Sequence, residues 1–211
     1  MTDNADTARD DLAFVRALVS EGGQVQASLG QALLAAGGCY GLQCLLQALF
    51  ASGVQAPFAV QLTVGILPTL LFLAAITWIT VRDKNRSRNS VGARAINAAF
   101  GGGGLAALAT ALIFGYLAYR TQNMGTWLLH PVMICVVQGT AWYTAYAIRR
   151  RGWYALASAG WFATSLLLAW LLGSGGPDIA TPFLLVLAFA LLGLMALPGW
   201  VLMRTGARLA A

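Results

Sequence analysis

The side chains of this sequence that could bind or react inside an apolar environment are mostly uncharged. Tyr40, Gln43 and Gln47 lie in one apolar segment, three and four residues apart, so a helix places them on one face. We expect this face to point inward, because an amide without a hydrogen-bond partner is unfavourable in lipid. Other apolar segments carry further amides, namely Gln61, Asn97 and Gln138.

These amides allow two interpretations. They could line a polar cavity, or they could form hydrogen bonds between helices, each worth about 0.6–2 kcal/mol. The spacing supports either interpretation, so all six side chains are candidates for the lining of a cavity.

Acidic side chains are absent from the predicted membrane-spanning segments. Five of the seven precede the first apolar segment, and the last two, Asp83 and Asp178, lie in predicted loops. Two carboxylates that could share general acid and base work therefore do not occur at membrane depth. Transporters driven by protons or sodium usually need such groups inside the membrane, so ion-coupled transport is disfavoured.

Histidine and cysteine are also sparse. With His130 as its single histidine, the chain cannot supply two axial histidines to a haem or build a His-rich zinc site. The three cysteines, Cys39, Cys44 and Cys135, form no CxxC pair and are expected to act as small apolar residues. His130 could be an external ligand or pH-sensing group, or an interfacial residue at a helix start. We expect no catalytic residue, no metal site and no cofactor.

A run of four glycines, Gly101, Gly102, Gly103 and Gly104, is the sharpest local feature. In water, each glycine destabilises a helix by about 1 kcal/mol relative to alanine. The run could allow neighbouring helices to approach closely, as could Gly37 and Gly41 in the first apolar segment. Alternatively, it could break the helix and expose carbonyl groups to a wet cavity.

Six apolar segments organise the chain. Hydrophobic residues make up 59% of the sequence and charged residues 9%, against about 25% charged residues in soluble domains. Each segment approaches the ~20 residues that a helix needs to cross a bilayer. The sequence therefore predicts an all-α polytopic membrane protein whose domain, 26–211, contains six transmembrane helices arranged as three hairpins. The segments are 31–51, 57–81, 95–119, 130–148, 153–173 and 182–203.

The basic residues indicate the orientation. With the N-terminus in the cytoplasm, all thirteen basic residues except Arg120 fall on the cytoplasmic side, as the positive-inside rule requires. The first 25 residues lack the basic start and short apolar run of a signal peptide. We therefore expect a bacterial inner-membrane protein with both termini in the cytoplasm. The net charge of +6 then reflects topology and contact with anionic lipid, so no direct binding of nucleic acid is expected.

Residues 1–25 are predicted to form a cytoplasmic extension with a short amphipathic helix over 10–21 that stops at Gly22 and Gly23. Asp10 and Asp11 suit the positive N-terminal end of that helix, and the glycines suit its exit. Its acidic and apolar side chains could attract a basic, partly apolar partner surface, such as that of a DNA-binding regulator. The candidate partner-binding residues are Asp10, Asp11, Leu12, Phe14, Val15 and Leu18.

The same segment carries a resemblance. Residues 11–22 read Asp-Leu-Ala-Phe-Val-Arg-Ala-Leu-Val-Ser-Glu-Gly and lead into a first span rich in small residues. This opening resembles that of a group of uncharacterised alphaproteobacterial six-span membrane proteins. The resemblance covers about twelve residues, transfers no catalytic or ligand residue, and implies a partner among small helix-turn-helix regulators.

Three functions remain open from the sequence. The first is a non-enzymatic regulatory or scaffold protein that binds a protein partner through its cytoplasmic N-terminal helix. The second is an oligomeric channel or facilitator for a neutral or weakly polar solute, based on the amides and the glycine run. The third, a membrane enzyme acting on lipid or sharing a haem or quinone with another subunit, lacks a nucleophile and base. The expected partners are the lipid bilayer and either another protein or further copies of this chain.

Overall fold

The described chain is entirely helical. The structure, a computed structural model, describes residues 3–83, 91–176 and 178–210, and the side chains of 23–83, 92, 94–176 and 178–208. No strand occurs within these ranges. The helices are α1 (Asp3–Ala51), α2 (Phe58–Asp83), α3 (Val91–Thr121), α4 (Met124–Trp127), α5 (Leu129–Arg149), α6 (Gly152–Ser174), α7 (Ala180–Leu191), the π-helical turn η1 (Leu192–Ala196) and α8 (Leu197–Ala210).

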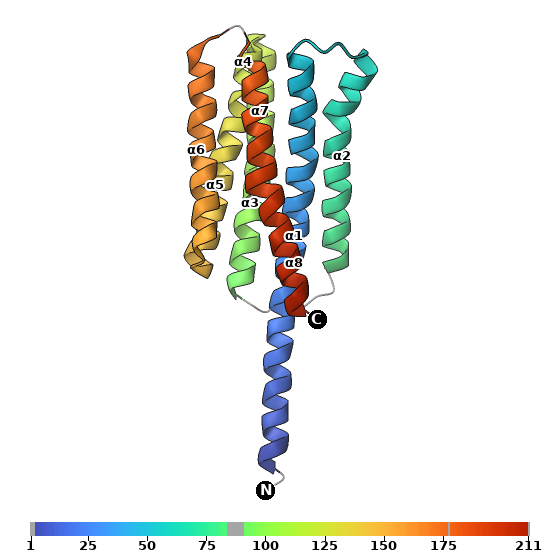
Figure 1. Ribbon diagram of the computed structural model, residues 1–211, viewed down its shortest axis with the longest axis vertical. Helices are drawn as coiled ribbons and strands as arrows, with labels where there is room; N and C mark the ends of the chain where they lie inside the picture. The colour runs from blue at the N-terminus through green and yellow to red at the C-terminus, as the bar shows by residue number, and fades with distance from the viewer. Residues whose placement is uncertain (1–2, 84–90, 177, 211) are drawn as a thin grey trace.

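Five helical stretches are long and apolar enough to cross a membrane: Gly23–Ala51, Phe58–Asp83, Arg94–Thr121, Gly152–Ser174 and Ala180–Arg208. The prediction of an all-helical chain with several candidate spans is therefore confirmed. The fourth predicted segment, 130–148, coincides with α5, which is 21 residues long but is not among these five stretches. Figure 1 shows α5 running beside α3 and α6 along the axis of the bundle.

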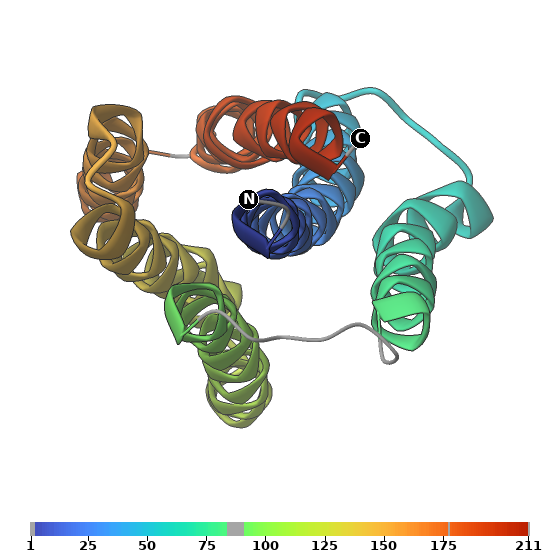
Figure 2. The same cartoon turned by 90° about the horizontal axis from the view of Figure 1, so that it is seen from below.

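The helices form an open arc. α1 packs against α7, η1 and α8 on one side and against α2 on the other. From α7 the arc continues through α6 and α5 to α3 (Figure 2). α2 and α3 are thus the two ends of the arc, and they face each other across an opening in front of α1.

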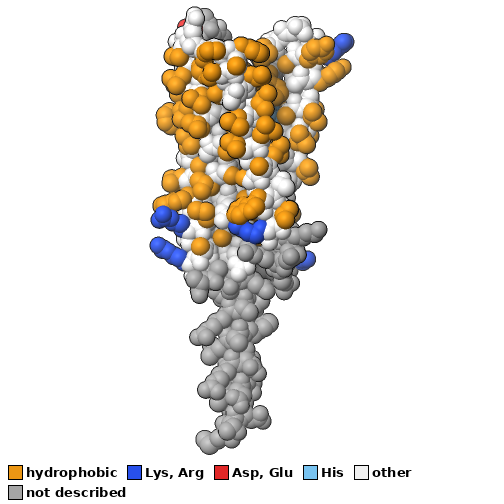
Figure 3. Space-filling model, turned by 90° about the vertical axis from the view of Figure 1, so that its right-hand side faces the viewer, with side chains coloured by type: hydrophobic (Ala, Val, Ile, Leu, Met, Phe, Trp, Pro, Cys, Tyr) orange, Lys and Arg blue, Asp and Glu red, His pale blue; other side chains and the backbone are white. Residues whose placement is uncertain are grey.

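The core lies on the α5, α6 and α7 side of this arc. Trp142 of α5 and Trp161 of α6 are fully buried, as is Phe183 of α7. Trp142 also meets Phe100 of α3 edge-on, with ring centroids 5.3 Å apart, which joins α3 to the core. In contrast, α2 and α3 leave most of their apolar side chains exposed, and Figure 3 shows hydrophobic side chains spread over the length of one face. Such a surface fits lipid as its solvent.

Glycines allow α1 to approach η1 and α8 at backbone distance. A Cβ atom added to Gly37 would lie 2.5 Å from the backbone nitrogen of Ala196. A Cβ atom on Gly206 would lie 2.5 Å from the carbonyl oxygen of Gly23. Only residues without a side chain permit such an approach. We call the glycines along this contact of α1 with η1 and α8 the glycine seam: Gly23, Gly30, Gly37, Gly199 and Gly206.

The seam explains why the predicted end of the N-terminal helix at Gly22 and Gly23 is wrong. α1 does not end at Gly22 and Gly23 but continues as one helix of 49 residues. Glycine weakens a helix in isolation, yet Gly23 is buried against α8, where packing outweighs local propensity. Gly23 therefore marks a close helix contact and not a helix end.

The sixth predicted segment, 182–203, contains a π-helical turn that the sequence did not reveal. At Leu192–Ala196 the helix widens between α7 and α8. A π turn shifts the hydrogen-bonding register, so some carbonyl groups there need other donors. The indole Nε1 of Trp161 donates to the carbonyl oxygen of Leu194 at 3.3 Å and supplies one.

Candidate functional site

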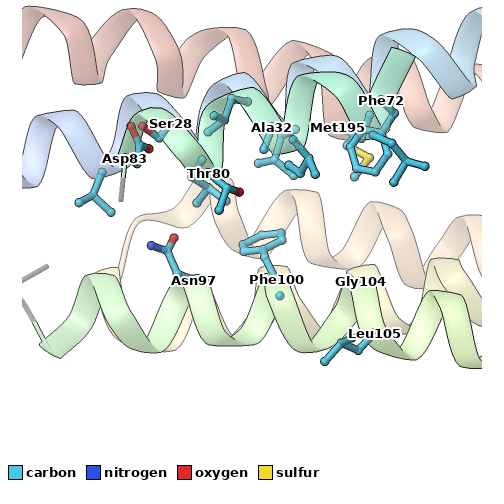
Figure 4. A pocket seen from close by; sticks show the side chains of 18 of the residues that line it. Ser28, Ala32, Phe72, Thr80, Asp83, Asn97, Phe100, Gly104, Leu105 and Met195 are labelled. Atoms are coloured by element: carbon cyan, nitrogen blue, oxygen red, sulfur yellow. The ribbon is translucent and has the colours of Figure 1, made fainter. Parts of the chain in front are cut away.

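A cavity of about 670 Å³ occupies the opening between α1, α2 and α3. It lies in the half of the bundle nearest the basal end, which we define as the end where α2 stops at Asp83 and α5 stops at Arg149. Figure 4 shows α3 on one side of the space and α1 with α2 on the other. Its lining residues include Ser28 and Ala32 from α1, Phe72 and Thr80 from α2, Asn97 and Phe100 from α3, Gln138 from α5 and Met195 from η1.

Polar side chains gather at the basal end of the cavity. Ser28, Thr80, Asp83 and Asn97 lie together at one end in Figure 4. The opposite end is apolar, with Phe72 and Met195 on its walls. Along the bundle axis the lining therefore changes from mainly hydrogen-bonding to mainly apolar, with Gln138 of α5 as a polar side chain in the deeper part.

Arg82 does not line the cavity, but its contacts hold the polar end of the cavity in place. Its Nε lies 3.3 Å from Oδ1 of Asp83, and its Nη2 donates to Oε1 of Gln31 at 2.7 Å and to Oγ of Ser28 at 3.4 Å. Its guanidinium also lies over the ring of Trp78, 4.7 Å from the centroid. These contacts connect α2 to α1 and hold Asp83 at the rim of the cavity.

The glycine run belongs to one wall of the cavity. α3 is continuous through Gly101–Gly104, so a broken helix is wrong for this segment. Gly101 and Gly104 line the cavity, and a Cβ atom on either would meet no atom within 4 Å. Gly103 alone packs closely, since its Cβ would lie 3.3 Å from Cγ1 of Val137, whereas a Cβ on Gly102 would meet nothing within 4 Å. Close helix packing therefore accounts for one glycine of the four.

Gln138 presents an amide to the same space. It lines the cavity, and its buried Oε1 has no hydrogen-bond partner among the described residues. Most buried polar atoms in proteins are hydrogen-bonded, so an atom of this kind needs an explanation. A donor from a bound molecule or a water would satisfy it.

Of the six side chains predicted as candidates for a cavity lining, the structure places two at the cavity. Asn97 and Gln138 line the cavity, and the remaining four do not. Gln43 donates to the carbonyl oxygen of Gly65 on α2 at 3.2 Å, and Gln61 donates to that of Ala56 at 3.0 Å. Tyr40 packs on Phe72 with ring centroids 5.6 Å apart, and Gln47 is half-buried. The face shared by Tyr40, Gln43 and Gln47 thus includes a helix-to-helix contact and lies outside the cavity.

Sequence reasoning missed four polar residues of the cavity: Gln24, Ser28, Thr80 and Asp83. The first two were missed because the first span was predicted to begin at residue 31, whereas the helix already runs inside the bundle there. The helical spacing of Gln24, Ser28 and Gln31 was the available signal.

A second polar cluster at the basal end joins three helices. Gln26 of α1 is 5% exposed, and its Nε2 donates to Oγ1 of Thr205 on α8 at 2.7 Å. Its Oε1 accepts a hydrogen bond of 2.6 Å from Nη1 of Arg149 on α5. Both ends of this buried amide are paired, so the cluster is a structural connection and not an open site.

The predicted partner-binding residues lie outside the described side chains: Asp10, Asp11, Leu12, Phe14, Val15 and Leu18. The structure describes the helical backbone of α1 through this region. Among the described residues, Cys44 and Cys135 are buried and Cys39 is half-buried, and all three are free thiols. Within the same part of the chain, no three His, Cys, Asp or Glu side chains come together to hold a metal ion.

Comparisons with protein-family models, curated proteins and solved structures find no match to this chain.

Proposed function

We propose that this chain is a six-span bacterial inner-membrane protein that acts as a regulatory or scaffold protein. It binds a cytoplasmic protein partner through the N-terminal part of α1. The observation that carries the proposal is the continuity of α1, which runs as one helix from Asp3 to Ala51. Figure 1 shows its first part extending well beyond the other helices. A helix that projects from a bundle offers its surface to a partner.

The inner part of α1 supports this role because it is firmly held. α8 packs along it through the glycine seam, and Gln26 connects it to Thr205 and Arg149. The projecting part is therefore the extension of a fixed element of the bundle. A partner bound there would be held at a defined place relative to the membrane.

The proposed orientation rests on the basal end. Arg82 lies over Trp78, and Arg204 lies over Trp200 with its guanidinium 4.2 Å from the ring centroid. Tryptophan beside arginine is typical of a membrane interface, and basic residues favour the cytoplasmic side. With the basal end in the cytoplasm, α5 is the fourth span and both termini are cytoplasmic.

A channel or facilitator has less support. Gln43, which would have lined a pore, donates to a backbone carbonyl of α2. The cavity is apolar over most of its lining, which suits the apolar part of a molecule better than a passing polar solute.

The proposal is tested by photo-crosslinking in membranes of producing cells, with a photoreactive residue at Ala17. We expect one discrete protein adduct that is lost in Leu12→Ser/Leu18→Ser, because this variant replaces two leucines of the apolar stripe that Leu12, Val15 and Leu18 form at helical spacing. The matched control is Ala13→Ser, which also introduces a serine but leaves the stripe leucines in place and should keep the adduct. Adducts with lipid alone, or an adduct that survives loss of the stripe, would contradict partner binding.

A further inference from the structure

We propose that the cavity between α1, α2 and α3 binds a single glycerophospholipid from the leaflet at the basal end. One acyl chain would enter between α2 and α3, and the phosphate would lie at the polar rim. This inference concerns a site that the partner-binding proposal does not use, so either can fail without the other.

The first argument is access from the membrane. α2 and α3 stand apart at the two ends of the arc (Figure 2). Two of the residues that line the cavity are also exposed at its mouth, Leu73 of α2 at 51% and Leu105 of α3 at 72%. Since the surrounding solvent of these helices is lipid, a lipid chain can reach the cavity sideways.

The second argument is the order of the lining. From Asn97 to Leu105, α3 rises about 12 Å, and from Asp83 to Phe72 α2 spans about 16 Å, at 1.5 Å per residue. This length is close to one leaflet of a hydrocarbon core about 30 Å thick. Apart from Gln138, whose amide lies deeper beside the level of Gly103, the polar side chains lie at the end nearest the membrane surface and the apolar ones lie deeper. An amphiphile with its head group at the basal end matches this order.

The third argument is charge at the rim. Arg94 and Asn97 are three residues apart on α3 and share a face, and Asn97 lines the cavity. On the opposite side, Arg82 does not line the cavity, but its ion pair with Asp83 offsets the charge of the one charged side chain that does. Among the described residues near this end, two guanidinium groups thus stand against one carboxylate, a balance that favours a phosphodiester over an uncharged head group.

The fourth argument is the wall of α3 at Gly101 and Gly104. Glycine is unfavourable in a helix, and no protein atom lies close enough to require it at either position. A side chain there would instead fill the cavity. The two glycines therefore keep open a volume that falls in the ~300–1,000 Å³ range of small-molecule sites. A helix is about 10 Å wide, so the volume of this cavity would hold only about one and a half turns of it. A membrane-spanning helix of a partner therefore does not fit.

The first experiment fills the cavity. The full chain is released for native mass spectrometry from nanodiscs of phosphatidylglycerol and phosphatidylethanolamine. We expect wild type and the control Gly102→Leu, which faces open space outside the cavity, to retain one phospholipid. Gly101→Leu/Gly104→Leu should retain about tenfold less, as a loss of about 1.4 kcal/mol gives. Equal retention by all three proteins would overturn the proposal.

A second measurement uses wild-type protein alone, so its result does not depend on whether the leucine variants fold. A phospholipid with a diazirine at the end of one acyl chain is photolysed in vesicles with wild-type protein. Met195 is buried and lines the cavity, so a chain outside the bundle cannot reach it. We expect an adduct at Met195 in addition to adducts at the exposed Leu112. Labelling at Leu112 alone would overturn the proposal.

A third measurement separates the head group from the chain. Wild-type protein is offered phosphatidylglycerol and diacylglycerol with the same acyl chains. We expect phosphatidylglycerol to be retained, and we expect Arg94→Gln to reduce its advantage over diacylglycerol. Equal retention of the two lipids by wild type would overturn the assignment of the rim to a phosphate.

Discussion

Gly199 of α8 lies against Leu34 of α1 so closely that a Cβ atom on the glycine would stand 2.5 Å from the backbone nitrogen of Leu34. The same Cβ would be 2.8 Å from the carbonyl oxygen of Gly30. These neighbours are backbone atoms, which cannot move aside as a flexible side chain can. The contact between the first and last long helices of the chain therefore depends on residues without side chains.

The seam gives the first prediction, which uses two adjacent glycines of α1. Gly37→Ala should lower the free energy of unfolding by about 1–3 kcal/mol, because the added methyl group would collide with the backbone of Ala196. Gly38→Ala should leave stability unchanged or raise it by up to about 1 kcal/mol, because its Cβ meets nothing within 4 Å. Unfolding in mixed micelles measures both. Equal effects at the two positions would contradict the seam.

The buried amide of Gln26 gives the second prediction. Gln26→Leu should lower the free energy of unfolding by about 1–3 kcal/mol, because it removes the buried hydrogen bonds that connect α1 to Arg149 and to Thr205. The control is Gln61→Leu, which removes a single hydrogen bond to Ala56 in an exposed place. This control should change stability by less than about 1 kcal/mol. The same micelle assay applies, and a neutral Gln26→Leu would show that the connection adds nothing.

The π turn gives the third prediction. Trp161→Phe keeps an aromatic ring in the core but removes the donor to the carbonyl oxygen of Leu194. We expect faster amide hydrogen exchange at Leu192–Ala196 and a loss of about 1 kcal/mol. Trp170→Phe is the control, since Trp170 is exposed on the same helix. Exchange that speeds up equally in both variants would argue against this hydrogen bond.

The fourth prediction distinguishes six spans from five. Between Thr121 and Arg151, the only long helix is α5 in this fully described part of the chain. If α5 crosses the membrane, cysteines at these two exposed positions lie on opposite sides. In a background with Cys39, Cys44 and Cys135 changed to alanine, an impermeant maleimide added to whole spheroplasts should label Thr121→Cys and spare Arg151→Cys. Labelling of both from one side would mean that α5 does not span.

Composition and periodicity predicted the positions of the long helices well, because the need to satisfy backbone groups in lipid leaves helices as the available structure. The C-terminal end of α1 was predicted correctly at residue 51, but its course before residue 31 was predicted poorly. Gly23 has the local properties of a helix stop, but it packs against Gly206 on α8, far away in sequence, and the helix continues through it. Local rules cannot include that contact.

The cavity was predicted in part for a similar reason. Asn97, Gln138, Gly101 and Gly104 were recognised as unusual residues for apolar segments, and they do line one space. Helical spacing also grouped Tyr40 with Gln43, but spacing does not say which neighbour a face meets. Here that neighbour is α2, through Phe72 and Gly65.

The length of α1 has a mechanical consequence. The first twenty residues of α1 form a helical arm about 30 Å long at 1.5 Å per residue. The glycine seam with α8 holds this arm at its inner end. Gln24 and Ser28 lie on α1 where the seam begins, and both are part of the cavity wall. A sideways force or a twist on the projecting arm is therefore transmitted along a stiff rod to the pocket rim, with no hinge of loop residues between them.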